Sequence, residues 1–180
     1  MATTTGIARR AVGSGVPFET PDLVPSTYSV PERVDGDGFA IRPLTVADAE
    51  LDYAAVTTSE ERLQGIFSPV DTWPAGLTTE QNRIDLAWHQ KEHQRRDAFT
   101  YAVVDADETA ELGCVYVQPT RVEGYDGAVY YWVSRAGVER GLADAIEATV
   151  RRWLADDWPL DSVAYPGRDI DWADWPPAAD

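Results

Sequence analysis

The stretch that decides the fold is YYWVSRAGVERGLADAIEATVRRWL, residues 130–154. It starts with an aromatic run that predicts a β-strand. From Leu142 the apolar residues recur at the i, i+3, i+4, i+7 spacing of an amphipathic helix about four turns long. Gly141 opens this helix after a loop, and the first N–H groups of a helix have no partner within it. Because these N–H groups carry the positive end of the helix dipole, the start of this helix can bind a phosphate group. The alternative is an ordinary helix N-terminus with small, closely packed residues.

The composition is that of a folded, acidic protein. At 180 residues with 44% hydrophobic content, seven Trp and eight Tyr, the chain suits one domain with a sizeable core. It has 31 Asp and Glu against 15 Lys and Arg, a formal net charge of -16, which repels nucleic acid and anionic membranes. Lys91 is the only lysine. Such a surface is expected of a halophilic protein, since concentrated salt screens its self-repulsion; an acidic cytosolic protein is the alternative.

The single cysteine and the absence of a long apolar run bear on the compartment. Cys114 excludes an internal disulfide and fits a reducing compartment, and its apolar neighbours indicate a buried structural thiol in a strand. No apolar run approaches the roughly 18 residues of a membrane span. Arg9 and Arg10 are not followed by the apolar region of a signal peptide. We therefore expect a cytoplasmic protein with no membrane partner.

The chain divides into an arm, a domain and a tail. Residues 1–37 are rich in Thr, Pro, Gly and Ser, and predict an extended arm whose Phe18, Leu23 and Tyr28 can pack against the domain. Residues 38–168 form the domain. Residues 169–180 are an acidic, aromatic tail that either folds back over the sheet or meets a second subunit in a homodimer; the sequence leaves both open.

Hydrophobic periodicity and capping residues predict a mixed α/β domain. Thr45 with Asp48, and Thr78 with Gln81, have the spacing of helix capping boxes. The predicted order is a strand at 39–44, a helix at 45–57, an irregular helical region at 58–77, a helix at 78–95, strands at 98–104, 112–118 and 128–133, the amphipathic helix, and a short strand at 161–165. This order predicts a mixed sheet with helices packed on its faces.

Two motifs in this order carry a resemblance to a known family. FAIRPLTVADAE at 39–50 is similar to the opening strand and helix of the GNAT superfamily of acyl-CoA-dependent N-acetyltransferases, and Tyr131-Trp132-Val133 is similar to its central strand. The resemblance covers roughly residues 38–165. It is closest to the subgroup that acetylates ribosomal-protein N-termini. It implies an acyl-CoA N-acyltransferase-like mixed sheet flanked by helices, with acetyl-CoA as acyl donor.

The resemblance also implies a cofactor site at the start of the amphipathic helix. The family's pyrophosphate loop, Arg/Gln-x-x-Gly-x-Gly/Ala, falls on residues 138–143. The implied cofactor-binding residues are Trp132, Val133, Val138, Glu139, Arg140, Gly141, Leu142 and Ala143. The chain departs from the pattern at the first two loop positions, and only about 15 residues follow the last strand, where the family adds a helix and two strands.

Members of this superfamily transfer the acetyl group directly to an amine. By resemblance, the backbone N–H of Val133 polarises the thioester carbonyl. Asp126 and Glu123, just before the central strand, are candidates for the base, although any acidic loop contains such residues. Tyr165 is a candidate acid for the leaving thiolate, with burial of a satisfied hydroxyl as the alternative.

The sequence leads to two functional hypotheses. The first is an acetyl-CoA-dependent N-acetyltransferase acting on a small-molecule or peptide amine. The second is a non-catalytic GNAT-like binding or interaction module.

His89 and His93 lie one helical turn apart, but no third ligand follows; we expect a solvated helix face and no metal.

Overall fold

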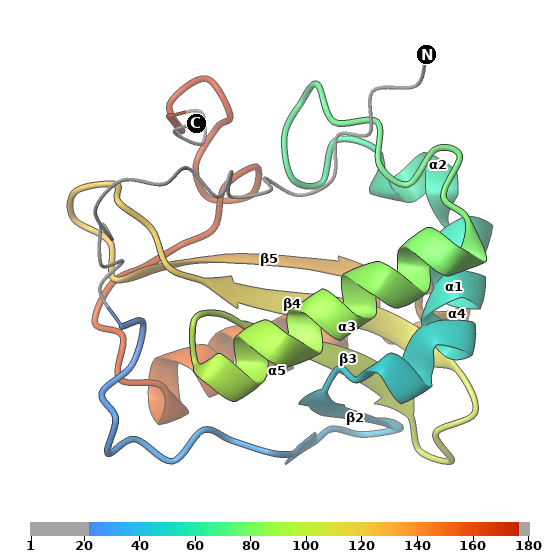
Figure 1. The fold of residues 1–180 in the computed structure, drawn as a ribbon, viewed down its shortest axis with the longest axis horizontal. Coiled ribbons are helices and arrows are strands. Elements are labelled where there is room, and N and C mark those ends of the chain that lie inside the picture. Colours follow the sequence, from blue (N-terminus) through green and yellow to red (C-terminus); the bar gives the residue numbers. More distant parts are fainter. Residues whose placement is uncertain (1–21, 177–180) are drawn as a thin grey trace.

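The computed structural model describes residues 22–176, which fold around one six-stranded sheet (Figure 1). The strands are β1 (Val34–Asp35), β2 (Phe39–Pro43), β3 (Phe99–Asp105), β4 (Glu111–Gln118), β5 (Gly127–Val133) and β6 (Val163–Ala164). They lie side by side in chain order; β1 to β5 are antiparallel, and β5 and β6 are parallel.

Helices cover both faces of the sheet, as the sequence predicted. They are η1 (Val46–Asp48), α1 (Ala49–Thr58), α2 (Glu60–Leu63), α3 (Thr79–Arg95), α4 (Arg135–Glu139) and α5 (Ala143–Asp157). In Figure 1, α3 crosses the front of the sheet and α5 lies behind it. Alternating strand residues therefore enter two cores: Trp132 packs with Leu86 of α3, and Tyr131 packs with Ile146 of α5.

The capping boxes set the starts of two helices. The Thr78 hydroxyl accepts a hydrogen bond from the Gln81 N–H at 3.2 Å, and the Gln81 side chain accepts one from the Thr78 N–H at 3.1 Å. Asp48 makes the corresponding contacts with Thr45 at the start of η1. Both predicted helices are confirmed, because a capping box satisfies amides that the first helical turn leaves unpaired.

Two predictions about the connections were wrong. Of the region predicted as helical at 58–77, Thr58 ends α1 and the rest is helical only in α2; the chain then turns at Gly65, where φ is 80°. The expected loop after the central strand contains the short helix α4 instead. The Ser134 hydroxyl caps α4 by accepting a hydrogen bond from the Gly137 N–H at 3.2 Å. A serine N-cap directly after the strand thus starts a helix at once.

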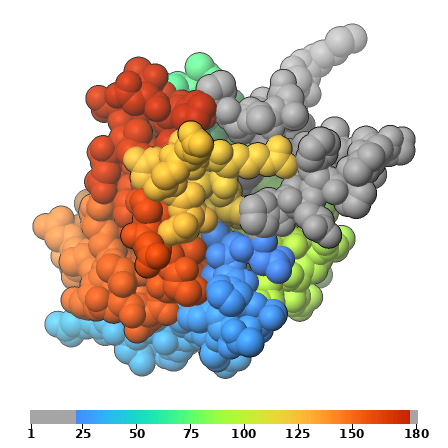
Figure 2. Space-filling view, turned by 90° about the vertical axis from the view of Figure 1, so that its left-hand side faces the viewer, coloured from blue at the N-terminus to red at the C-terminus, as the bar shows by residue number. Residues whose placement is uncertain are grey.

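The described part of the predicted arm packs against the domain. Leu23 and Val24 are buried, and the Tyr28 hydroxyl donates a hydrogen bond to the Asp157 carbonyl at 2.7 Å. Figure 2 shows this segment, in blue, against the C-terminal part of the chain, in orange. The expected packing of Leu23 and Tyr28 is confirmed, whereas Phe18 lies outside the described residues.

Within residues 22–176, none of the helices has the length and apolarity needed to cross a membrane.

Candidate functional site

The outer edge of β5 is open over most of its length. β6 pairs with it only through Gly127–Val163 and Ala128–Ala164, and no other described strand continues the pairing. On the opposite side, the Ser134 N–H donates to the Leu112 carbonyl of β4 at 2.8 Å.

Strand alternation shows which backbone groups the open edge presents. Since Ser134 directs its N–H toward β4, Trp132 does the same, and the backbone groups of Tyr131 and Val133 point the other way. The open edge therefore presents N–H and C=O groups to the space beside the strand. The Val133 N–H, which the resemblance assigns to the thioester carbonyl, is one of them.

Two adjoining pockets lie along this edge. One has a volume of about 200 Å³ and is lined by Arg62, Leu63, Ile66, Tyr131, Trp132, Val133, Ala143, Asp144, Glu147 and Arg168. The other has a volume of about 270 Å³ and is lined by Gln64, Gly65, Ile66, Tyr130, Tyr131, Pro166, Gly167, Arg168 and Trp172. The walls are thus α2 with the segment after it, β5, the first turn of α5, and the C-terminal segment.

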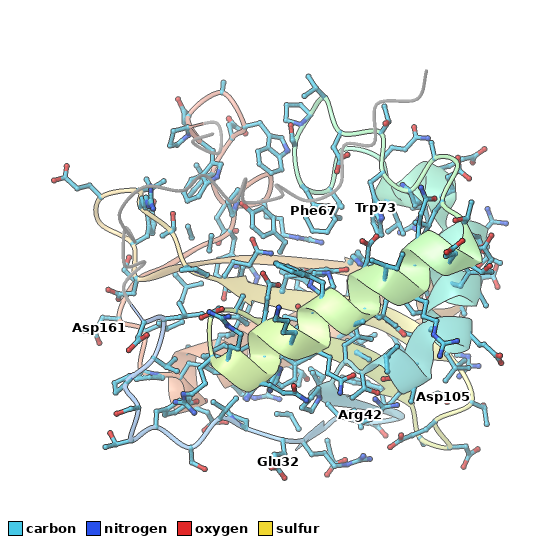
Figure 3. The ribbon with its side chains drawn as sticks, in the orientation of Figure 1. Glu32, Arg42, Phe67, Trp73, Asp105 and Asp161 are labelled. Carbon is cyan, nitrogen blue, oxygen red and sulfur yellow. The ribbon has the colours of Figure 1, made fainter. Side chains whose placement is uncertain are left out.

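Aromatic contacts hold the segment after α2 against the sheet. Figure 3 shows Phe67 and Trp73 on this segment, above the strands. The Phe67 ring meets Tyr116 of β4 edge-on, with centroids 5.1 Å apart, and Trp73 lies 6.3 Å from Trp132. Such aromatic pairs add to the free energy of burial, so they fix this wall of the pockets.

The start of α5 differs from the predicted phosphate loop. The N–H groups of Arg140, Gly141 and Leu142 donate to carbonyls of the α4 segment at 2.9–3.1 Å, so these three amides have no partner within α5 but are already hydrogen-bonded outside it. Helix α5 begins at Ala143, and its first internal hydrogen bond runs from the Ile146 N–H. The amides of its first turn, residues 143–145, carry the positive end of the dipole.

The eight predicted cofactor-binding residues fall into two groups. Three of them line the first pocket: Trp132, Val133 and Ala143. Of the other five, Val138 and Glu139 end helix α4, and Arg140, Gly141 and Leu142 form the turn from α4 to α5. Arg140 donates a hydrogen bond from Nη1 to Oδ2 of Asp105 at 3.0 Å, and Glu139 is exposed. The turn therefore uses its arginine to hold the end of β3.

None of the three predicted catalytic residues lines either of the two pockets. Asp126 and Glu123 precede β5 and are exposed. The Asp126 carboxylate accepts a hydrogen bond from the Ser162 N–H at 2.8 Å, which joins the loops before β5 and β6. Tyr165 is buried beyond β6, with the Arg151 guanidinium 4.4 Å from its ring centroid, and burial raises its pKa.

Cationic residues that sequence reasoning missed complete the pockets. Arg62 comes from α2 and Arg168 from the C-terminal segment, and both line the first pocket with Ala143. The sequence had left open whether the segment around Arg168 folds back or meets a second subunit. It folds back: Arg168 donates from Nη2 to the Tyr131 carbonyl at 3.0 Å. No local pattern marks either arginine, because the two are more than a hundred residues apart and meet only in the fold.

The two histidines of α3 are packed side chains. His89 is buried with its ring 5.5 Å from that of Tyr116, and His93 is half-buried against Phe99 and Tyr101. The prediction of a solvated helix face was therefore wrong. In the part of the chain that the structure describes, no group of three metal-binding side chains is found.

Comparison with solved structures decides which fold this is. The ribosomal-protein-S5-alanine acetyltransferase from Vibrio fischeri superposes with a TM-score of 0.51 at 19% identity, over 68% of this chain and 67% of that chain. The fold is that of the GNAT acetyltransferases. Ribosomal-protein acetyltransferases are among the similar structures, which confirms, at the level of the fold, the resemblance seen in the sequence.

Two further structures with the GNAT fold contain ligands. The RimL ribosomal L7/L12 alpha-N-protein acetyltransferase in complex with coenzyme A has a TM-score of 0.53 at 17% identity, over 68% of this chain and 67% of that chain. The microcin C7 self immunity acetyltransferase MccE in complex with acetyl-CoA and AMP has a TM-score of 0.52 at 14% identity, over 71% and 68% of the two chains. No protein-family model and no curated protein matches the sequence. At these identities the comparisons show the fold alone.

Proposed function

We propose that this protein is an acetyl-CoA-dependent N-acetyltransferase that transfers an acetyl group directly to an amine. The observation that carries the proposal is the open edge of β5, with the first turn of α5 and a pocket of about 200 Å³ beside it. An extended, amide-bearing chain can add to such an edge through backbone hydrogen bonds. The GNAT fold and the ligands of RimL and MccE support coenzyme A as the carrier of the acetyl group.

The residues that line the first pocket suit the parts of an acyl-CoA. The amides at the start of α5, with Arg62 nearby, suit a diphosphate, because both present positive charge to the same pocket. The Val133 N–H at the open edge suits the thioester oxygen, where it stabilises the negative charge that develops during transfer. Glu139 is exposed, which leaves its carboxylate free to point into solvent.

The reaction then needs only proton transfers from the protein. The amine nitrogen attacks the thioester carbonyl carbon, the carbon–sulfur bond breaks, and one proton passes from the amine to a base while the thiolate takes up another. Asp126 or Glu123 is our candidate for the base and Tyr165 for the acid; none of them lines either pocket, and Asp126 and Glu123 lie at the end of β5 opposite Val133, so they can exchange protons with the reacting groups only through intervening water.

A second candidate function is a non-catalytic binding or interaction module on the same fold. Two observations favour it. The amides of residues 140–142 are already hydrogen-bonded, and Arg168 already occupies the Tyr131 carbonyl on the open edge. A protein that had lost catalysis would keep the GNAT sheet while internal contacts fill the donor site.

Calorimetric titration with acetyl-CoA in high salt tests the proposal. The wild-type protein should release heat on binding, and Ala143→Trp should abolish it by filling the pocket at the start of α5. Ala155→Trp, on an exposed position of the last turn of the same helix, is the matched control and should bind as the wild type does. Absence of binding at millimolar acetyl-CoA would overturn the enzyme and favour the module. Where binding occurs, release of free thiol across a panel of amines measures turnover.

A further inference from the structure

Arg168 occupies the middle of the open edge of β5. It donates from Nη2 to the Tyr131 carbonyl at 3.0 Å, and its guanidinium lies 3.7 Å from the centroid of the Tyr131 ring. Its Nη1 is 3.6 Å from the Glu147 carboxylate of α5. One side chain thus contacts the strand edge, an aromatic face and the helix that border the first pocket.

The turn that carries Arg168 is strongly organised. Three consecutive N–H groups, of Arg168, Asp169 and Ile170, donate to the Tyr165 carbonyl at 3.0–3.3 Å. Gly167 has φ of 73°, and a Cβ there would lie 2.6 Å from the Trp172 ring. The chain can make this close approach only with glycine.

Side chains on both flanks tie the turn to the domain. The Asp169 carboxylate accepts two hydrogen bonds from the Arg151 guanidinium, at 2.7 and 2.9 Å, in the bidentate geometry that favours such pairs. Trp172 stacks on Tyr130 of β5 with ring planes 12° apart. The turn is therefore held over both pockets by contacts to α5 and to β5.

We propose that residues 165–172 form an autoinhibitory latch in which Arg168 holds the edge position that an extended ligand must take. The inference rests on the proposed function, because the ligand it excludes is the acyl donor. A carbonyl on a strand edge accepts either the guanidinium or a ligand N–H in the same direction, so the two compete. The acyl donor then binds only when the latch is open. Its apparent dissociation constant equals the intrinsic dissociation constant divided by the fraction of molecules in which the latch is open.

Removing the arginine should therefore tighten binding. We expect Arg168→Gln to bind coenzyme A about tenfold more tightly than the wild type, the size of effect that one charge-assisted hydrogen bond supports. The matched control is Arg152→Gln, an exposed arginine of α5, which loses the same charge without touching the edge. Because coenzyme A is anionic, charge loss alone should weaken binding slightly, opposite to the expected effect.

A second measurement makes the latch testable without a ligand. Amide hydrogen exchange in residues 165–172 should be faster in Arg168→Gln than in Arg152→Gln, because the turn loses its anchor on β5. Equal exchange in the two variants, or coenzyme A binding no tighter in Arg168→Gln than in the control, would overturn the latch. Faster exchange with no coenzyme A binding in any variant would overturn the proposed function and the latch with it, whereas equal coenzyme A binding by Arg168→Gln and Arg152→Gln would overturn the latch alone. Should Arg168→Gln fail to fold, Arg168→Lys retains the charge, loses the planar fork and should show the same changes more weakly.

Discussion

Arg140 donates a hydrogen bond from Nη1 to Oδ2 of Asp105 at 3.0 Å, across 35 residues of sequence. The same carboxylate accepts hydrogen bonds from the N–H groups of Thr109 at 2.7 Å and Ala110 at 3.1 Å. Burial alone would raise the pKa of Asp105, but these hydrogen bonds outweigh it and hold the pKa below its usual value. One carboxylate therefore joins the end of β3, the hairpin to β4 and the turn that precedes α5.

The two partners should differ in what their removal costs. Asp105→Ala leaves two backbone amides without their acceptor, so we expect a loss of about 1–3 kcal/mol in the free energy of unfolding. Arg140 is half exposed, and Arg140→Ala should cost less than about 1 kcal/mol. Urea unfolding of the two variants at one salt concentration measures both values. An equal or larger cost for Arg140→Ala would contradict the central role of the carboxylate.

Two glycines near the start of α5 should respond differently to alanine. A Cβ at Gly137 would lie 2.6 Å from Cγ1 of Val133 and 2.9 Å from the Leu112 carbonyl oxygen, which cannot move without distorting β4. We expect Gly137→Ala to lower the free energy of unfolding by about 1–3 kcal/mol, although alanine favours helices. Gly141 has φ of 72° with nothing within 4 Å of a Cβ, so Gly141→Ala should cost only about 1 kcal/mol of backbone strain.

Thermal unfolding followed by circular dichroism ranks these two variants directly. The midpoint should fall further for Gly137→Ala than for Gly141→Ala. The opposite order would mean that α4 shifts away from β4 without loss, and that its close approach contributes little.

A buried pair of carboxyl groups should make stability fall as the pH rises. Glu111 of β4 is fully buried; burial, and then the charge of Asp52 on α1, raise its pKa well above the usual value. Burial also raises the pKa of Asp52. Groups with a raised pKa hold protons in the folded state that the unfolded chain releases. Their stabilising effect is therefore complete below the unfolded pKa, about 4.3 for glutamate, and is lost as the pH rises toward the folded pKa.

Glu111→Gln should isolate this effect, since the amide has the shape of the protonated acid. Relative to the wild type, the variant should gain stability with rising pH by up to about 1.4 kcal/mol per pH unit. Urea unfolding between pH 5 and 8 measures the difference. Glu108→Gln on the same hairpin is the control. Hydrogen bonds from Arg33 and Arg42 lower the pKa of Glu108, so this carboxyl group is ionised in both the folded and the unfolded state. The difference in the free energy of unfolding between Glu108→Gln and the wild type should therefore not change over this pH range. If the difference in the free energy of unfolding between Glu111→Gln and the wild type were the same from pH 5 to pH 8, Glu111 would be ionised in the folded protein.

The net charge of -16 predicts that salt stabilises the protein. Self-repulsion among carboxylates opposes the compact state, and potassium chloride screens it, with a screening length of about 3 Å at 1 M against about 10 Å at 0.1 M. The unfolding temperature should therefore rise steeply up to about 1 M salt. A flat or falling curve would mean that ion pairs such as Arg42–Asp48, at 2.8 Å, outweigh the repulsion.

Local patterns predicted most of the fold. The capping boxes at Thr45 and Thr78 and the apolar stripe of α5 act between residues three or four apart, and the structure has helices at all three places. The central strands match their predictions to within one residue at each end. Helix α4 was missed because Gly137 reads as a loop residue. Its reason is tertiary: only glycine fits against Val133 and the Leu112 carbonyl.

The candidate site was predictable only in part. Val133 and Ala143 were placed at the pocket because they belong to the strand and helix that the sequence identified. Arg62 and Arg168 were not, since each lies in an irregular part of the chain and acquires its role from a distant partner.

By itself the sequence determined the helices α1, α3 and α5, the central strands and the excess of negative charge, because these depend on periodicity, caps and composition within short stretches. The tertiary structure alone decided what the β5 edge faces. There, β6 stops pairing after two residues, α5 begins at Ala143, and the C-terminal turn returns to place Arg168 on the Tyr131 carbonyl. The physical reason is that a backbone carbonyl has no sequence signature. Whether it binds a strand, a guanidinium or a ligand depends on which distant segment reaches it.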